Sequence, residues 1–591
     1  MTFSQHQAAR QDKRLDLCRL DKAKLRRFAA GIVVSLALAG SQPAHAQWTP
    51  VTTGIDYREF TVSGPNRVFV ARMNKSEPSV TIDSMIAQGR LSGGRETVSG
   101  MVSRYDQSTG YWGREWGQRY EAKVAINGNF FDLNTGVPEP GQILSAWYAW
   151  RLGDWGGRSG FAWTLNRTAF IGACIHPIPG TNYITFADQT TQTFDEINKA
   201  RGANDLILYT THHDSHTPAQ SSGVEVMVEM DRPAGILPQP AMALGTVVAI
   251  RPNQGSTPLY FDHLVLSAGG TAATTLQAHV SIGDRIGVTQ EFATYQLDCN
   301  TPDPIDWTNA YANVGGNFQF LRGGAVQSTS DPGLTARHPR TAIALDATYV
   351  YFLVVDGRTS ISVGMTMSEL ASFCLSELGA TDGVNHDGGG SSAIWVDGQI
   401  RNSPSDGSER TVANGIMMAR VLPTELSPTY MLNDTVATTS GAELRLGPGT
   451  HYASLTTVSS GTQGTVLPHS ALGVRAKGAH WWRVDFAGQT GWVDEGALQL
   501  IHRDPDAGVQ PQPDAAAPSD GAAPSDGAAP TDSAASSDAA PGPDSGASPR
   551  GAGSGCSCQA PVTGERHSGA AGAAPWLLVL LGMVLVRRRR R

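Results

Sequence analysis

The chain has 591 residues, of which 40% are hydrophobic and 7% aromatic, so most of it can bury a core and wholesale disorder is excluded. Its 53 acidic side chains outnumber the 45 basic ones, and the net charge of −8 argues against a nucleic-acid partner, which requires a basic face. The 66 glycines and the 17% of charged residues indicate a turn-rich, largely β protein of two to four domains. Six cysteines are too few for a disulfide scaffold.

The first 46 residues have the organisation of a secretory signal. Arg26 and Arg27 precede an apolar stretch at 28–38 that is too short to span a bilayer comfortably. The segment 44–46, Ala-His-Ala, then matches the small-x-small pattern of a cleavage site. A basic N-terminal arm is the alternative, but such an arm would not end in this pattern. We therefore predict an exported protein, in a compartment where disulfide bonds form.

A large unit at 47–425 carries both strand and helix patterns. Alternating apolar runs at 67–72 and 349–355 predict strands. Thr366 and Glu369 form a capping box at the start of an amphipathic stretch, which predicts a helix. We therefore expect an α+β domain built on a twisted mixed sheet with few helices.

Three cysteines fall in this unit. Cys374 lies on the apolar face of the predicted helix, which predicts a buried thiol. Cys174 and Cys299 lie in loop-like contexts and could pair with each other. Because three cysteines leave one over, the connectivity stays open.

A glycine-rich segment at 385–392 follows the predicted helix. Three consecutive glycines cost conformational entropy, so we expect a requirement for backbone access, such as N–H groups that face a phosphate or sugar oxygen. No Lys-Ser/Thr pair follows, which excludes a P-loop, and a strand rather than a helix comes next, which excludes a dinucleotide-binding turn. A tight hairpin is the alternative, but the polar residues of the segment favour a site: Asn385, Asp387, Ser391 and Ser392.

Three further polar clusters are individually ordinary. The segment 123–132 is an apolar strand that ends in an Asn-Gly turn. The segment 338–343 is a strand that opens with a cation, usually a solvated group. The third cluster combines 355–358 with 408–414.

Three motifs together resemble the phosphodiester glycosidase family. They are 125–131 (Ala-Ile-Asn-Gly-x-Phe-Phe), 339–343 (Pro-Arg-Thr-Ala-Ile) and 385–392 (Asn-x-Asp-Gly-Gly-Gly-Ser-Ser), and the resemblance extends from about 57 to 420. The sequence departs from the family pattern at Asn129, where Gly is common, and at His386, where an apolar residue is common. Both departures could alter substrate contacts, so the sugar specificity of the family is not transferred.

The resemblance implies cleavage of the anomeric C–O bond of a sugar-1-phosphodiester, with a phosphate as leaving group. Asp387 is expected to act as nucleophile or base at an oxocarbenium-like centre. Arg340 is expected to hold the phosphate through a bidentate contact, and Asn127 completes the expected catalytic set by holding sugar hydroxyls.

The remaining expected site residues would bind the substrate. Arg358 and Arg410 are alternative phosphate ligands, and Asp356 is either a second catalytic carboxylate or simply the partner of an Arg. The full expected binding set is Asn129, His338, Asp356, Arg358, Asn385, Gly388, Gly389, Gly390, Ser391, Ser392 and Arg410.

The segment 211–216 has the composition of a metal cluster, with three histidines and an aspartate. Its spacing matches no zinc pattern, which favours a solvated loop. No cofactor is firmly expected, although calcium held by loop carboxylates stays open.

Residues 430–501 form a second, strand-rich unit. The motifs 444–450, 481–484 and 491–493 resemble a bacterial SH3 domain, which implies binding of cell-wall peptides or glycans. A spacer domain without a ligand is the alternative.

The C-terminal part has two segments. Residues 504–555 are rich in Pro, Ala, Ser and Asp, which predicts an extended linker. Residues 556–591 contain a Cys-Ser-Cys motif, an apolar run at 570–586 and five terminal arginines, an order that resembles the myxobacterial C-terminal sorting signal. A plain membrane tail anchor is the alternative, and both place the protein at the cell envelope.

The sequence as a whole predicts an envelope-associated glycosidase for a sugar-1-phosphodiester or phosphorylated glycan, with a membrane contact through its C-terminal segment. The alternative is a non-catalytic envelope protein that binds glycan in the same cleft and through the SH3-like domain.

Overall fold

The computed structural model describes residues 47–503 and 505, apart from 113–114, 140, 151–158, 234–243 and 306. The predicted signal at 1–46, the linker from 506 onward and the C-terminal segment at 556–591 lie outside the described residues. Within the described part of the chain, no helix is both long and apolar enough to cross a membrane.

The described protein is mostly β, with 46% of residues in strands and 11% in helices. Among the described strands, only β13 (Glu196–Ile197) and β14 (Leu206–Tyr209) pair in parallel. The prediction of an α+β domain on a mixed sheet is therefore wrong. Parallel neighbours need long crossover connections, usually helices, whereas antiparallel neighbours can be joined by short turns. The single helix recognised in the sequence could not supply the crossovers that a parallel or mixed sheet would need.

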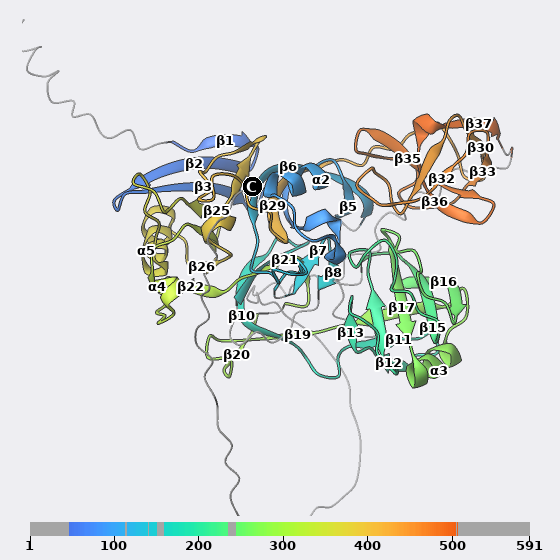
Figure 1. The fold of residues 1–591 in the computed structure, drawn as a ribbon, viewed down its shortest axis with the longest axis horizontal. Coiled ribbons are helices and arrows are strands. Elements are labelled where there is room, and N and C mark those ends of the chain that lie inside the picture. The colour runs from blue at the N-terminus through green and yellow to red at the C-terminus, as the bar shows by residue number, and fades with distance from the viewer. Residues whose placement is uncertain are drawn as a thin grey trace, which may run out of the picture. The chain divides into compact units, whose positions relative to one another are not determined.

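The first sheet combines strands from the N-terminal part of the large unit with strands from residues 318–385. β3 pairs with β25, so the two strands predicted at 67–72 and 349–355 lie side by side (Figure 1). The helix α5 (Met367–Phe373) begins with the predicted capping box at Thr366 and packs on this sheet through Leu370 and Phe373. The sheet order is β1 (Thr49–Thr52), β2 (Ile55–Val62), β3 (Asn66–Asn74), β25 (Tyr349–Val355), β24 (Arg340–Leu345), β26 (Asp382–Asn385), β22 (Phe318–Arg322) and β23 (Ala325–Val326).

A second sheet shares a hydrophobic core with the first. Its Val124, Ile126 and Ile416 pack in one cluster with Phe69 and Ile343 of the first sheet. Because β26 belongs to the first sheet and β27 to the second, the glycine-rich segment between them crosses from one sheet to the other. The order is β28 (Gln399–Ile400), β27 (Ile394–Val396), β6 (Glu115–Asn127), β29 (Asn414–Leu422) and β4 (Val80–Ile86), with β5 (Thr109–Trp112) beside β6 and α2 (Val98–Tyr105) packed nearby.

Two further sheets complete the large unit. One has the order β20 (Pro302–Asp303), β19 (Phe292–Tyr295), β10 (Ala169–Pro177), β9 (Ser159–Thr164), β21 (Ala310–Gly315), β7 (Gln142–Leu144) and β8 (Trp147–Trp150). The other has the order β12 (Thr191–Thr193), β11 (Tyr183–Thr185), β18 (Arg285–Thr289), β16 (Gly245–Pro252), β15 (Val224–Met230), β17 (His263–Ala268), β14 and β13. The helices α3 (Gly270–His279) and α4 (Pro332–Thr335) are short.

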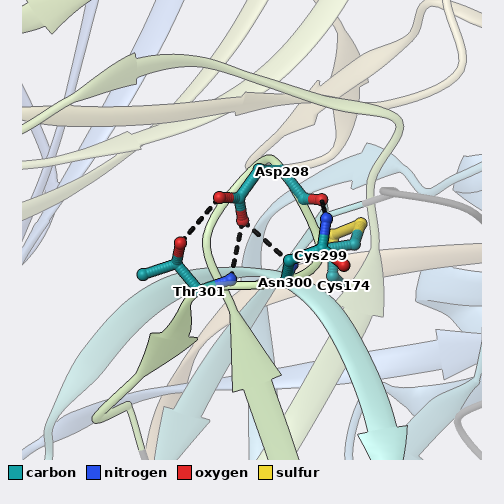
Figure 2. The surroundings of a disulfide bond; sticks show 5 residues. All are labelled: Cys174, Asp298, Cys299, Asn300 and Thr301. Carbon is teal, nitrogen blue, oxygen red and sulfur yellow. Dashed lines mark hydrogen bonds between the residues drawn. A yellow bond between two sulfur atoms is a disulfide. The ribbon is translucent and has the colours of Figure 1, made fainter. Parts of the chain in front are cut away.

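Cys174 and Cys299 form a disulfide, with their Cα atoms 5.3 Å apart (Figure 2). Cys174 lies in strand β10 rather than in a loop, whereas Cys299 lies within a turn that Asp298 closes by accepting the N–H groups of Asn300 and Thr301. Cys374 is free and buried, as predicted.

The strand-rich unit forms its own barrel-like sheet around Trp482 and Val484 (orange in Figure 1). Its strands are β30 (Thr435–Thr438), β31 (Ala442–Arg445), β32 (Ser454–Val458), β33 (Gln463–Val466), β34 (Val474–Ala476), β35 (Ala479–Phe486), β36 (Gln489–Asp494) and β37 (Leu498–His502). Trp481 and Trp492 belong to the hydrophobic cluster of the large unit rather than to this core. The small domain is therefore docked on the rest of the described chain.

Candidate functional site

The three motif segments meet at the glycine-rich segment between β26 and β27. The backbone N–H of His386 donates to Thr341 O at 2.9 Å, and that of Gly389 donates to Pro339 O at 2.9 Å. The N–H of Asp387 donates to Gly128 O at 3.1 Å. We call residues 386–392 the glycine loop.

Asn127 ties these segments together from a fully buried position. Its Oδ1 accepts from Thr341 Oγ1 at 2.8 Å and from the N–H of Ala393 at 3.2 Å. Its Nδ2 donates to Asp387 O at 2.7 Å. The side chain therefore positions the backbone that carries Asp387.

The glycines admit close neighbours that a Cβ would displace. A Cβ on Gly388 would lie 2.7 Å from Pro339 O, and Gly389 has a positive φ of 63°. A Cβ on Gly390 would collide with the guanidinium of Arg410. The absence of side chains thus allows backbone and a guanidinium to approach the loop closely.

Asp387 is half-buried at the head of this loop. Burial raises its pKa above the usual value, while a hydrogen bond from the Ser391 side chain and the positive charge of Arg410 oppose that rise. The balance leaves a carboxyl group that is less acidic than an exposed aspartate and lies beside a cation.

Two guanidinium groups lie beside the loop. Arg410 forms an ion pair with Asp406 at 2.6 Å, and its Nη1 approaches Ser391 Oγ at 3.4 Å. Arg358 is held in a left-handed conformation with φ 66°, and its Nη1 approaches Ser405 Oγ at 3.4 Å.

His338 lies near Arg358 and Arg340. Burial and the charges of Arg340 and Arg358 lower its pKa. This neighbourhood therefore favours an anion.

Arg340 is placed differently from these two arginines. Its Nε donates to Met365 O at 2.7 Å, and its Nη2 donates to Gly333 O at 2.9 Å and Ala336 O at 2.6 Å. Burial lowers its pKa to about 10. The guanidinium holds the backbone around α4, which leaves Arg358 and Arg410 as the cations beside the glycine loop.

Asp356 also has a supporting position. Its Oδ1 accepts from the N–H of Ser403 at 2.9 Å, and Arg67 lies 3.9 Å from its Oδ2. Burial raises its pKa. Asn402 bridges Asp356 and Ser392 O, so Asp356 supports the glycine loop indirectly. Asn402, Ser405 and Asp406 were not singled out in the sequence, because a polar loop after a strand carries no distinctive pattern.

Asn385 fixes the neighbouring backbone, since its Oδ1 accepts from the N–H of Phe318 at 3.0 Å. The two departures from the family pattern have similar surroundings. Asn129 donates to Glu139 O at 2.7 Å, and His386 Nδ1 contacts Gly315 O at 2.8 Å, yet Asn129 Oδ1 and His386 Nε2 are buried without a partner. Burial lowers the pKa of His386 to about 4, so its ring is neutral at physiological pH.

The loop is a poor calcium site. Calcium takes six to eight oxygen ligands, whereas Asp387 and Asp406 both lie beside Arg410. Within the described ranges, the grouping with metal-ligand geometry is Glu229, Asp262 and His469 rather than the histidines of 211–216. Arg483 donates to both oxygens of Glu229, so that grouping is an ion-pair network.

Residues 246–419 match the family model of the phosphodiester glycosidases. The chain carries a phosphodiester glycosidase domain. A second match assigns residues 440–499 to the bacterial SH3 domain family. The first match includes the glycine loop, Arg358 and Arg410, whereas Asn127 precedes it and is joined to it by the hydrogen bonds above.

Similar proteins were found for parts of the chain. An uncharacterized protein, YomE, from the SPbeta prophage of Bacillus subtilis strain 168 is 40% identical over 96 residues, which are 16% of this chain and 15% of that protein. A hypothetical protein from Synechocystis has a TM-score of 0.42 at 18% identity, over 64% of each chain. The catalytic domain of zebrafish N-acetylglucosamine-1-phosphodiester alpha-N-acetylglucosaminidase, auto-inhibited by its pro-peptide, has a TM-score of 0.31 at 13% identity, over 64% of this chain and 84% of that one.

Proposed function

We propose that the phosphodiester glycosidase domain hydrolyses the C1–O bond of a sugar-1-phosphodiester at the glycine loop. The observation that carries the proposal is the position of Asp387, a half-buried carboxyl group beside Arg410 and Ser391, on a loop whose glycines allow a guanidinium to approach closely. A carboxylate suits an oxocarbenium-like centre, and neighbouring cations suit a phosphate.

In this reaction the C1–O bond breaks and its electron pair leaves with the phosphate oxygen. Arg358 and Arg410 would neutralise the phosphate monoester that departs, so less protonation of the leaving group is needed than for an alcohol. Asp387 would stabilise or attack C1, and a water oxygen completes the sugar C1–OH while its second proton passes to solvent. Asn127 would keep the Asp387 backbone in place.

The test is the substitution Asp387→Asn in a protein that spans residues 47–503. With N-acetylglucosamine-1-phospho-methyl ester and related sugar-1-phosphodiesters, we expect release of reducing sugar to fall at least about 1000-fold with little change in thermal stability. Asp397→Asn is the matched control, because Asp397 is exposed and lies at the turn between β27 and β28. Undiminished turnover in Asp387→Asn would remove this residue from the reaction.

The alternative function is glycan binding without catalysis. It predicts that the same substrates bind and are not turned over by the unsubstituted protein. We favour the enzyme because a carboxyl group of raised pKa beside a guanidinium is more typical of reaction centres than of binding clefts.

We further propose that the protein is exported and retained at the cell envelope. The support is the signal pattern at 1–46, the cysteine-containing segment at 556–591 and the bacterial SH3 domain, which would contact cell-wall peptides or glycans. Fractionation of cells that express the full chain, compared with a form truncated after 555, tests this: the truncated form should be released from the envelope fraction.

A further inference from the structure

A cavity of about 310 Å³ lies apart from the glycine loop, where three parts of the described chain meet. Its walls come from β5 and β6, from the segments 88–90 and 211–215, and from residues 446–453 of the SH3 domain. Tyr120 in its wall is seven residues before Asn127 along β6, which corresponds to roughly 23 Å. We call it the junction cavity, and it is separate from the proposed reaction site.

One wall of the junction cavity is aromatic and rigid. The rings of Tyr111 and Trp116 lie 5.1 Å apart at 71°, and Trp147 lies 6.3 Å from Trp116. Phe261 packs on Trp116, and Tyr452 of the SH3 domain packs on Phe261. Because these rings pack against one another, the ring surfaces that border the cavity are fixed before any ligand arrives.

The turn beside Trp147 is held in an unusual conformation. Ser145 and Ala146 have positive φ values of 46° and 63°, at positions where hairpins prefer Asn-Gly. The N–H of Ser145 donates to Asp83 Oδ1 at 2.9 Å, so a buried carboxyl group maintains the turn. Burial raises the pKa of Asp83 to about 7.

The two arginines of the lining are already paired with carboxylates. Arg90 pairs with Asp214 at 3.1 Å, and Arg104 pairs with Glu96 at 3.0 Å. Burial lowers the pKa of His212 to about 4, so this ring is neutral at physiological pH. The lining therefore offers little net charge to a ligand.

Three polar atoms of the lining are nevertheless unsatisfied. Arg90 Nε, His212 Nε2 and His451 Nδ1 are buried without a hydrogen-bond partner in the protein. A buried donor or acceptor without a partner is costly, so these atoms favour a ligand that brings its own hydrogen-bonding groups.

An open groove adjoins the cavity. It shares Arg104, Thr450 and His451 with the cavity, and it continues past α2 to Lys477. A ligand can therefore extend from the cavity along the groove, as one unit of a chain would.

We propose that the junction cavity binds a neutral sugar unit of a glycan chain, with further units in the groove. Apolar C–H faces of a sugar would lie on the aromatic wall, and its hydroxyl groups would pair with the unsatisfied nitrogens. The cavity volume lies at the lower end of the range of about 300–1,000 Å³ that is usual for ligand sites, which fits a single ring. The site includes a loop of the SH3 domain, so it exists only in the docked arrangement.

Calorimetric titration of residues 47–503 with uncharged tetrasaccharides (chito-, cello-, malto- and mannotetraose) tests the proposal, with pentaglycine as the peptide probe. We expect at least one tetrasaccharide to bind, and His212→Ala and His451→Ala to weaken it about tenfold or more. Asp387→Asn should leave this affinity unchanged, and so should His502→Ala, which alters an exposed histidine at the end of β37. Activity lost in Asp387→Asn with glycan binding retained would separate the two sites.

A second variant avoids the buried histidines. Thr450 is exposed and borders both the cavity and the groove, so Thr450→Trp should block the entrance without disturbing the core, and binding should be lost while the thermal unfolding midpoint stays within about 2 °C. The proposal is overturned if no tetrasaccharide binds, if only the peptide binds, if binding survives all three substitutions, or if it disappears in Asp387→Asn.

Discussion

Asn127 illustrates how one buried amide can organise a site. It accepts from Thr341 and Ala393 and donates to the backbone of Asp387, so a single residue connects three distant segments of the chain. Such a residue can be essential for activity without touching a substrate, because its loss would allow the glycine loop to relax.

We therefore expect Asn127→Ala to destabilise the protein by about 2 to 4 kcal/mol, because three buried polar groups lose their partner. Urea unfolding measures the change, and kcat should fall with it. Asn134→Ala alters an exposed amide in the loop between β6 and β7 and should change stability by less than about 0.5 kcal/mol. A stable but inactive Asn127→Ala variant would instead indicate a direct role in the reaction.

We assign the acid limb of the activity profile to ionisation of the Asp387 carboxyl group. Its ionised form is the reactive one, and burial raises its pKa, so the acid limb of kcat should lie above the ordinary aspartate value of about 3.9. Arg410 opposes this rise. We expect Arg410→Gln to move the acid limb upward by about half to one pH unit, and a downward shift would contradict the assignment.

At the scale of elements, the disulfide closes a long segment of the large unit. Cys174 and Cys299 are 125 residues apart, and the enclosed chain contains the sheet built from β11 to β18. Crosslinking so distant a pair lowers the conformational entropy of the unfolded chain and so stabilises the folded protein. Strain in the folded state can reduce this stabilisation.

Replacing both cysteines, as Cys174→Ser with Cys299→Ser, should lower the free energy of unfolding by about 2 to 5 kcal/mol. Reductant should destabilise the unsubstituted protein by a similar amount and leave the double variant unchanged. Equal sensitivity of both proteins to reductant would show that another thiol is responsible.

Local elements were more predictable than their arrangement. The run 349–355 coincides with β25, and the capping box at Thr366 begins α5, because apolar alternation and helix caps are encoded within a few residues. The parallel or antiparallel sense of a strand depends on its partners, which local patterning does not encode, and so the mixed sheet was predicted wrongly.

The candidate site was likewise predictable in its local features but not in the directions of its side chains. The glycine run pointed to close backbone approach, and the structure places Pro339 O and Arg410 there. The direction of the Arg340 guanidinium, in contrast, depends on carbonyl groups at 333–336 and at Met365, which no pattern around 340 reveals. The junction cavity was equally hidden, because its walls come from segments of two domains.

At the scale of the whole described molecule, the SH3 domain is fastened to the large unit by a buried ionic network. Burial alone would raise the pKa of Asp262, but the neighbouring His263 and His469 hold it well below its usual value. Tyr260 adds a hydrogen bond to Thr490 O at 2.8 Å, and Arg483 adds two to Glu229.

Because the pKa of Asp262 is lowered on folding, its contribution is present above the ordinary aspartate pKa and is lost as pH falls through the lowered value. We expect Asp262→Asn to loosen the docking at neutral pH, so that limited proteolysis between 423 and 434 releases the SH3 domain faster than in the unsubstituted protein. Glu443→Gln, an exposed change in the same domain, should have no effect. Resistance equal to that of the unsubstituted protein would contradict the role of Asp262.

The shared walls of the junction cavity carry a thermodynamic consequence. An occupant that touches both domains must tighten their association by the same factor by which their association tightens its own binding. The glycan proposed for this cavity would therefore strengthen the docking of the SH3 domain while it is bound, and its dissociation would weaken that docking by the same factor.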